Sequence, residues 1–255
     1  MTQTSQIGAR GAEAQTTLQL QGAERLPALL WLWLPVVVGG VLLLSWHLNP
    51  GFYKAYVAGE IGILEGTHVL VPLMAAVVAL RILLMPEVRQ DRLAWIWIFL
   101  GLLGCLYIAG EEASWGQHYG DWLTPESWQA INDQGETNLH NTSSWLDQKP
   151  RTLLELGVIV GGIVIPLLAL KRPAIRQGRF ALFLPPLVCL PTAVIGEAAK
   201  FWERLHGKVL PDWQLFYNAS EVQELYIYLF IHFYLIVFRN RVLARRAAGL
   251  PARPA

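Results

Sequence analysis

Glutamate and histidine side chains recur inside and beside the apolar stretches of this chain of 255 residues. Glu65 and His68 stand three residues apart in one such stretch and therefore share one face of a helix. This spacing lets a carboxylate and an imidazole converge on one metal ion in carboxylate-bridged helical bundles. A hydrogen-bonded pair that supports the bundle has the same spacing, so the pair alone does not decide between the two roles.

A second group of acids follows the next apolar run. If the helix continues here, Glu111, Ser114 and His118 share one face, at positions i, i+3 and i+7, whereas Glu112 points elsewhere. Negative charge at the C-terminus of a helix opposes the macrodipole, so capping does not explain these two glutamates. We therefore expect a functional role for them; the alternative is a pair of solvated loop acids.

The segment 132–141 is dense in hydrogen-bonding side chains. Within it, Glu136 and His140 stand four residues apart and can meet on one helical face. A segment of this composition is often only a solvated turn. Because it follows the glutamates at positions 111 and 112, we expect Glu136 and His140 to share a site with them.

Glu221 and Glu224 open the last apolar run, where acids complement the dipole of a helix N-terminus. This placement gives them a structural explanation. They nevertheless share one stripe with Tyr228 and His232, and His232 lies well inside the apolar run, which helix capping does not explain. The stripe therefore joins the candidate site.

Carboxylates gathered in one cavity repel one another, so such a cavity must bind protons, a divalent metal or a cationic substrate. Imidazole mixed with carboxylate suits zinc, iron or manganese better than calcium. The candidate metal ligands are Glu65, His68, Glu112, His118, Glu136, His140, Glu221 and Glu224. The candidate catalytic residues are Glu111, Glu112, Ser114, His118, Glu136 and His140.

Other charged residues have local structural explanations. Glu197 precedes Lys200 by three residues and Arg204 by seven, so we expect an ion pair within one helix. Glu155 can pair with Arg151, one turn earlier. Neither glutamate is placed in the candidate site.

Six apolar runs must position these residues, and each is long enough to cross about 30 Å of hydrocarbon. The runs are Leu29–Trp46, Ile61–Leu84, Leu93–Gly110, Leu153–Leu170, Phe180–Gly196 and Val222–Phe238. The composition agrees, because 54% of the residues are hydrophobic and only 15% are charged. The prediction is an all-α fold, a polytopic membrane bundle with six transmembrane helices and an interfacial outer loop.

Charge separates across this topology. Fourteen of the 20 Lys and Arg residues and four of the 19 acids fall on one side, a net charge of +10 there. The remaining six basic and fifteen acidic residues give the other side a net charge of −9. The positive-inside rule makes the basic side cytoplasmic. We therefore expect a bacterial inner-membrane protein with both termini in the cytoplasm and the candidate site facing outward.

The expected domain organisation is a single transmembrane domain over residues 28–240, with the outer loop at 111–152. Flexible cytoplasmic tails are expected at 1–27 and 241–255. Within the outer loop, Thr124 precedes Pro125 like a capping hydroxyl, which predicts a short interfacial helix near Pro125–Ile131. Ser220 and Gln223 have the spacing of a capping box for the last helix.

The segment Glu111–Gln117, together with the segment Asn132–Asn141, resembles the signature of a group of uncharacterised bacterial multi-pass membrane proteins. The resemblance covers about 30 of the 255 residues and implies no activity. The chain departs from the membrane hydrolases that include the alkaline ceramidases, whose zinc site uses a His-x-x-x-His pair on a seven-helix bundle. No such pair is present in this sequence.

Two classes of function remain open. The first is an enzyme with an outward-facing metal or acid–base site that acts on a lipid, polyprenyl-linked or other envelope substrate. The alternative is a cation- or proton-coupled carrier, or an accessory subunit that docks a protein partner through its Trp-rich outer loop. Membrane lipids are expected partners, and topology and anionic lipid explain the basic stretches better than nucleic acid does.

Overall fold

The chain was analysed as a computed structural model that describes residues 22–59, 62–120, 122–132, 135–139, 142, 144–176, 178–206, 209 and 214–252. Helices account for 79% of the described residues, which form no strand. The helices that are long and apolar enough to span a membrane are Leu29–Leu48, Ile63–Leu83, Arg92–Glu112, Arg151–Lys171, Ala181–His206 and Ala219–Ala247. The predicted all-α bundle is confirmed, and the chain is a multi-pass membrane protein.

The spans are built from several helical segments. They comprise η1 (Leu29–Trp33) and α2 (Leu34–Leu48); α4 (Ile63–Leu83); α6 (Arg92–Glu112); α9 (Ser144–Val158), η5 (Ile159–Val164) and α10 (Ile165–Lys171); η7 (Ala181–Phe183), η8 (Leu187–Cys189) and α11 (Leu190–His206); and α12 (Ala219–Ala247). Short helices connect them: α3 (Pro50–Phe52), η2 (Tyr53–Val57), α5 (Pro86–Gln90), η3 (Ser114–Gly116), α7 (Gln117–Gly120), α8 (Glu126–Gln129) and η6 (Pro173–Arg176).

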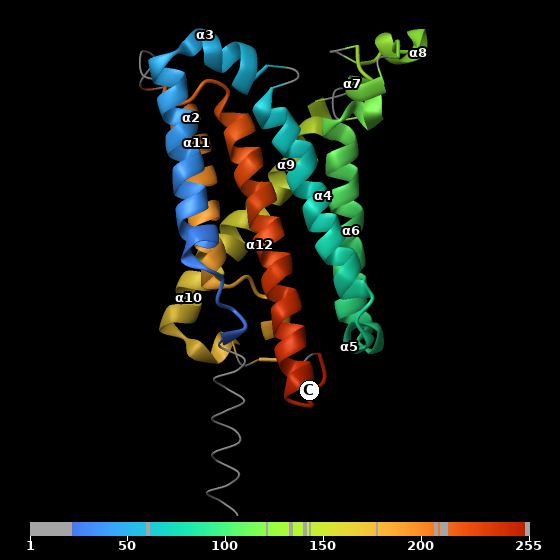
Figure 1. The fold of residues 1–255 in the computed structure, drawn as a ribbon, viewed down its shortest axis with the longest axis vertical. Coiled ribbons are helices and arrows are strands. Elements are labelled where there is room, and N and C mark those ends of the chain that lie inside the picture. The colour runs from blue at the N-terminus through green and yellow to red at the C-terminus, as the bar shows by residue number, and fades with distance from the viewer. Residues whose placement is uncertain are drawn as a thin grey trace, which may run out of the picture.

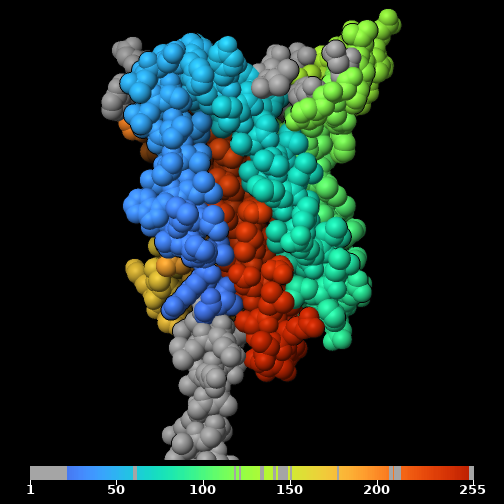
Figure 2. Space-filling view, viewed as in Figure 1, coloured from blue at the N-terminus to red at the C-terminus, as the bar shows by residue number. Residues whose placement is uncertain are grey.

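Helix α12 lies at the centre of the bundle. It runs between α2 and α11 on one side and α4 on the other, and α6 packs against the outside of α4 (Figure 1). In its most apolar window 61% of the residues are buried inside the protein, the largest share of any span. Figure 2 shows α12 at the surface along the strip between α2 and α4. A residue on α12 can therefore contact several helices at once.

Glycine lets α2 and α11 approach α12 closely. A Cβ atom on Gly39 would lie 2.7 Å from the Tyr226 hydroxyl oxygen, and one on Gly196 would lie 2.8 Å from Tyr226 Cβ. The hydroxyl of Tyr226 donates a hydrogen bond to the backbone oxygen of Pro35. The tyrosine thus satisfies its polar end inside the bundle, in space that only glycine leaves free.

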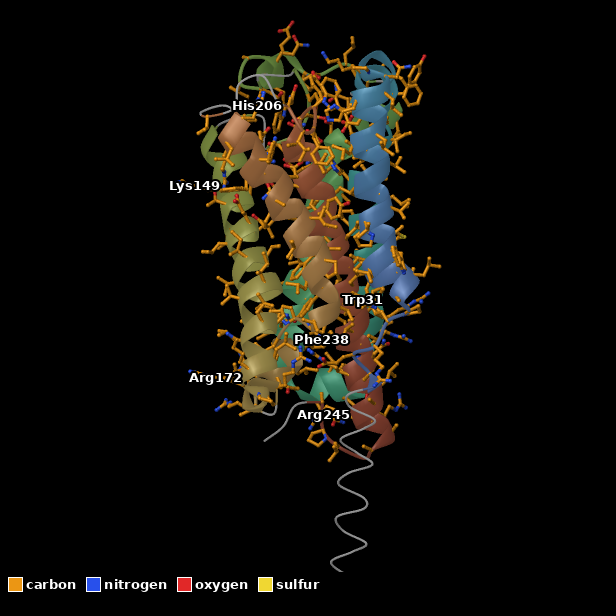
Figure 3. All side chains as sticks on the ribbon, turned by 90° about the vertical axis from the view of Figure 1, so that its left-hand side faces the viewer. Trp31, Lys149, Arg172, His206, Phe238 and Arg245 are labelled. Carbon is orange, nitrogen blue, oxygen red and sulfur yellow. The ribbon has the colours of Figure 1, made fainter. Side chains whose placement is uncertain are left out.

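The bundle has two chemically different ends. Lys149 and His206 lie at one end, and Arg172 and Arg245 lie at the opposite end (Figure 3). We call the end where α6 and α11 finish and α4 and α12 begin the acidic end, and the opposite one the basic end. At the basic end, Glu24 binds the guanidinium groups of Arg176 and Arg241 at 2.8 and 2.5 Å.

These contacts bear on the expected tails. Residues 1–21 of the expected N-terminal tail lie outside the described residues, but Glu24, from the same tail, is held by two arginines of the bundle. The Nη1 atom of Arg241 also donates to the backbone oxygens of Ala181, Leu182 and Leu184. At the other end of the chain, α12 continues to Ala247, past the expected boundary at residue 240.

Two expected caps differ in the structure. A short helix is present near the predicted position as α8, but Thr124 donates its hydroxyl to the Gly135 oxygen and makes no capping bond. At the start of α12 the cap position is Asn218, in a left-handed conformation, and no side chain caps the helix. The Ser220 hydroxyl instead bonds Glu203 on α11, at 3.2 Å. In both places the hydroxyl bonds a residue outside the helix that it was expected to cap.

Candidate metal centre

The imidazole of His68 lies at the middle of a cluster of carboxylates near the acidic end. His68 belongs to α4 and is 0% exposed. Its Nε2 atom is 3.0 Å from the backbone oxygen of Glu221 on α12. Its Nδ1 atom faces two carboxylate oxygens, at 3.4 Å from Glu112 Oε2 and 3.3 Å from Glu221 Oε2.

The partner of Nε2 restricts the protonation of the ring. A backbone oxygen can only accept, so Nε2 carries a hydrogen and donates it to Glu221. The Nδ1 atom is buried and makes no hydrogen bond of good geometry. Because Nδ1 faces negative oxygens, the geometry suits either a neutral ring with a cation between these atoms or a ring that carries a second hydrogen on Nδ1.

Among the described residues, one group could hold a metal ion. It consists of His68, Glu112 and Glu224, whose ligand atoms all lie within 4.8 Å of one another. These residues come from α4, α6 and α12. Small side-chain rotations would bring such atoms to the distance of about 2.0–2.2 Å that zinc requires. Four of the predicted site residues, these three and Glu221, are therefore brought together.

Tyr228 supports this group from α12. Its hydroxyl donates to Glu112 Oε1 at 2.8 Å, and its ring meets the His68 ring edge-on, with centroids 5.4 Å apart. One oxygen of Glu112 is therefore held by the tyrosine while the other faces the histidine. Hydrogen bonds of this kind orient metal ligands and fix which atom coordinates.

Arg151 also borders the centre, and this placement was not predicted from the sequence. Its Nη1 atom lies 2.9 Å from Glu224 Oε1, so the predicted pair of Arg151 with Glu155 is wrong. Glu155 instead accepts two bonds from Arg204, at 2.7 and 3.0 Å. The guanidinium reaches across from the start of the fourth span to α12 rather than along its own helix.

Among the described residues, Glu197 does not form the ion pair with Lys200 or Arg204 that was predicted within α11. Glu197 accepts a hydrogen bond from Gln223 of α12 at 3.3 Å. Lys200 binds Glu203 at 2.5 Å, and Arg204 is held by the carboxylate on α9. Within the described part of the chain, span five contributes no member of the ligand group.

Glu111, Ser114 and Glu136 form a separate hydrogen-bond network that fastens the loop after α6. Glu111 accepts from Trp115 Nε1 at 2.6 Å and from the Leu139 backbone nitrogen at 2.7 Å. The Ser114 hydroxyl, which is buried, donates to Glu136 Oε2 at 2.7 Å.

Further bonds complete this loop network. Asn138 Nδ2 donates to the Ser114 hydroxyl oxygen at 3.1 Å and to Glu136 Oε2 at 2.6 Å. Ser114 and Trp115 adopt positive φ values of 43° and 54°, so the chain reverses sharply directly after α6. These bonds hold the loop against the end of α6, and among the residues that the structure describes neither acid belongs to the ligand group.

The remaining predicted residues are placed as follows. Glu65 is partly exposed on α4 and lies outside the group whose ligand atoms converge. His118 belongs to α7, but its side chain is not among those that the structure describes, and His140 lies outside the described residues altogether. The expectation that these histidines join the site stays a prediction.

The carboxylates of the centre are partly exposed. His68 is fully buried, whereas the side chains of Glu112, Glu224 and Glu221 are 19%, 18% and 35% exposed. Burial and, to a lesser extent, the nearby charge of Glu221 together raise the pKa of the Tyr53 hydroxyl to about 12. This hydroxyl therefore stays protonated at neutral pH. Three protein ligands on a partly open site are the arrangement of catalytic rather than structural zinc centres.

The chain was also compared with proteins that are already known. No protein-family model, no curated protein and no solved structure matches it.

Proposed function

We propose that His68, Glu112 and Glu224 hold a divalent transition metal, zinc, iron or manganese, and that the protein is a membrane enzyme built around this ion. The reaction would be metal-assisted hydrolysis or group transfer on a lipid or other envelope substrate. The observation that supports this most is the buried Nδ1 of His68, which faces two carboxylate oxygens while Nε2 is committed to a backbone oxygen.

The same geometry has one competing explanation. If both ring nitrogens carry hydrogens, His68 is an imidazolium that neutralises Glu112 and Glu221 as a buried ion cluster. Such a cluster needs no metal and has no catalytic task. Metal analysis of the purified protein separates the two explanations, because only the neutral ring can coordinate an ion.

The residues around the ligands suit acid–base chemistry. A bound ion would polarise the scissile bond of the substrate and favour ionisation of an attacking water or hydroxyl. Glu221 faces His68 but lies outside the ligand group, so its partly exposed carboxylate is placed to take a proton. Tyr228 holds Glu112 in position and thereby keeps the coordinating oxygen directed at the histidine.

The proposed setting is the bacterial inner membrane, with the acidic end outside and both termini in the cytoplasm. The support is the charge of the chain, +10 on the side of the basic end and −9 on the other. The metal would then sit just beneath the outer surface of the membrane, where lipid headgroups are within reach.

The first prediction concerns metal content. Protein purified in detergent should contain about one equivalent of zinc, iron or manganese per chain. His68→Gln and Glu112→Gln should each lose most of it, because a three-ligand site does not retain metal with one ligand missing. Mass spectrometry of the metal content measures this directly.

Glu203→Gln is the matched control, because Glu203 lies at the same end but pairs with Lys200 outside the ligand group. It should keep the metal. Size-exclusion profiles show whether each variant is folded. Metal-free wild-type protein, or equal metal in all variants, would instead favour the buried ion cluster.

A second candidate function is supported by the loop that follows α6. Tyr119, Trp122, Leu123 and Ile131 are all exposed there, and Leu123 is 91% exposed. Apolar and aromatic side chains on a surface loop suit either the headgroup layer or a protein partner. An accessory subunit that docks a partner through this loop would show no stoichiometric metal, so the same analysis separates the two functions.

A further inference from the structure

The guanidinium of Arg151 has one occupied edge and one free edge. Its Nη1 atom binds Glu224 Oε1 at 2.9 Å, whereas its Nε and Nη2 atoms are buried and have no hydrogen-bond partner among the described residues. These two nitrogens share one edge of the planar group, so their hydrogens point in the same direction. This edge of a guanidinium can donate two parallel hydrogen bonds to two oxygens of one carboxylate or phosphate.

Unpartnered donors of this kind are costly. A buried guanidinium keeps its charge at any physiological pH, and each buried N–H without an acceptor loses the hydrogen bond that water would give it. A ligand that accepts hydrogen bonds from Nε and Nη2 would explain why the charged guanidinium of Arg151 lies next to the candidate centre. The ligand must supply two acceptor oxygens close together.

The position of Arg151 indicates where such a ligand comes from. Arg151 lies inside α9 and is the first residue of the apolar helical stretch Arg151–Lys171, which is long enough to span a membrane. This position fits a side chain at the depth of the lipid headgroups. The side chain is 26% exposed, although its free edge is covered, so a headgroup must displace neighbouring side chains to reach that edge. The carboxylate of Glu224 connects the guanidinium directly to the ligand group.

We propose that the free edge of Arg151 binds the phosphate of a lipid substrate and holds it beside the metal. This inference rests on the proposed function and specifies its substrate class, a lipid with a phosphate headgroup. Phosphate fits because it can offer two oxygens to the guanidinium and a third to the metal ion. A neutral headgroup would leave the two donors of Arg151 unsatisfied.

Charge makes this binding depend on the metal. With His68 neutral and Glu112, Glu221 and Glu224 all ionised, the three carboxylates outweigh the single positive charge of Arg151 by two. The site without metal therefore repels an anion. A divalent ion restores neutrality, so metal and phosphate should each strengthen the binding of the other.

Another arginine at the same end provides a control. Arg204 donates from Nη2 to both oxygens of Glu155, at 2.7 and 3.0 Å, and lies outside the ligand group. Its guanidinium is 56% exposed and already holds a carboxylate. Removing its charge changes the net charge of the acidic end as much as removing that of Arg151 does, but leaves the proposed phosphate site intact.

The test is the binding of phosphatidic acid to Mn²⁺-loaded protein in detergent, with diacylglycerol as the lipid without phosphate. Bound phosphorus next to Mn²⁺ relaxes rapidly, so ³¹P relaxation reports both binding and proximity to the metal. Wild-type protein and Arg204→Gln should bind phosphatidic acid equally. Arg151→Gln should bind it at least about tenfold more weakly while retaining its Mn²⁺. Inorganic phosphate is the matching soluble probe.

Arg151→Lys keeps the charge near Glu224 but lacks the paired edge, so it should stay folded and still lose about tenfold in lipid affinity. Unchanged lipid affinity in both Arg151 variants would overturn this inference and leave the metal centre standing. Inorganic phosphate that binds as tightly as phosphatidic acid would overturn the lipid substrate. Wild-type protein that takes up no Mn²⁺ would overturn the metal centre itself, and the inference with it.

Discussion

Glu111 and Glu112 are neighbours in the chain and face different networks. Successive residues of a helix point about 100° apart, so two adjacent glutamates cannot serve one site equally. Glu111 is buried and accepts from Trp115 and Leu139 in the loop, whereas Glu112 accepts from Tyr228 and faces His68. One acid thus holds the loop in place and the other belongs to the candidate centre.

This division makes a prediction for two neighbouring substitutions. Glu111→Gln should lower the free energy of unfolding by about 1–3 kcal/mol, because it weakens two charge-assisted hydrogen bonds to a buried carboxylate. It should also make the loop cleave faster under limited proteolysis, with the metal retained. Glu112→Gln should lose the metal with less effect on the loop. Thermal unfolding, proteolysis and metal analysis of both variants check this.

The two variants control for each other, since each replaces one glutamate at the end of α6 by its amide. If Glu111→Gln lost metal as completely as Glu112→Gln, the separation of the loop network from the centre would be wrong.

The partners of single charged residues were the least predictable feature. The sequence correctly indicated that Glu111 and Glu112 point apart and that His68 lies with acids of the last span. It did not indicate Arg151, since spacing within a helix favoured Glu155 as its partner. Local spacing lists only the candidates on one helix, whereas partners on other helices depend on how the bundle packs.

At the scale of elements, α12 organises both the core and the site. It supplies Glu221, Glu224 and Tyr228 near one end and the buried Tyr226 that packs against α2 and α11. The boundaries of most spans were predicted to within a few residues because apolar length sets them. The capping box predicted at Ser220 is absent, and the Ser220 hydroxyl bonds Glu203 on α11 instead. Sequence spacing does not reveal such a contact between helices.

The packing of α2 on α12 gives a prediction with a control on the same helix. A Cβ atom on Gly39 would lie 2.7 Å from the Tyr226 hydroxyl oxygen, whereas one on Gly40 would meet nothing within 4 Å. Gly39→Ala should therefore destabilise the protein by about 1–3 kcal/mol through overpacking. Gly40→Ala should be neutral or stabilise it by about 0.5–1 kcal/mol. Thermal unfolding in detergent measures both; equal effects would contradict the close approach of the two helices.

At the scale of the whole molecule, the charge distribution predicts an orientation. A reporter of cytoplasmic location fused after Ala255 should be active, and one inserted near Asp133 should report the outside, because the arginine-rich end stays on the cytoplasmic side. Signals of the opposite sense at both positions would place the candidate centre on the cytoplasmic face. The proposed outer-leaflet substrate would then be wrong, although the metal group itself would be unaffected.

The fold class could be predicted from composition and apolar length. Inside a bilayer the backbone must satisfy its own hydrogen bonds, and a helix does so within a single apolar segment. That acids from distant spans would gather could also be anticipated from the cost of burying them in hydrocarbon. Which of these acids lie together could not be predicted from the sequence. Glu112 joined His68 while Glu136 joined Ser114, and that choice depends on helix rotation and on how the chain turns after α6.

X-ray absorption at the zinc edge of protein loaded with one equivalent of Zn²⁺ tests the central claim most directly. The wild-type spectrum should show nitrogen and oxygen ligands at about 2.0–2.2 Å, with outer-shell scattering from one imidazole. His68→Gln should lose the imidazole signal, and Tyr228→Phe should keep it. A wild-type spectrum without imidazole, or one that His68→Gln leaves unchanged, would contradict a metal centre on His68, Glu112 and Glu224.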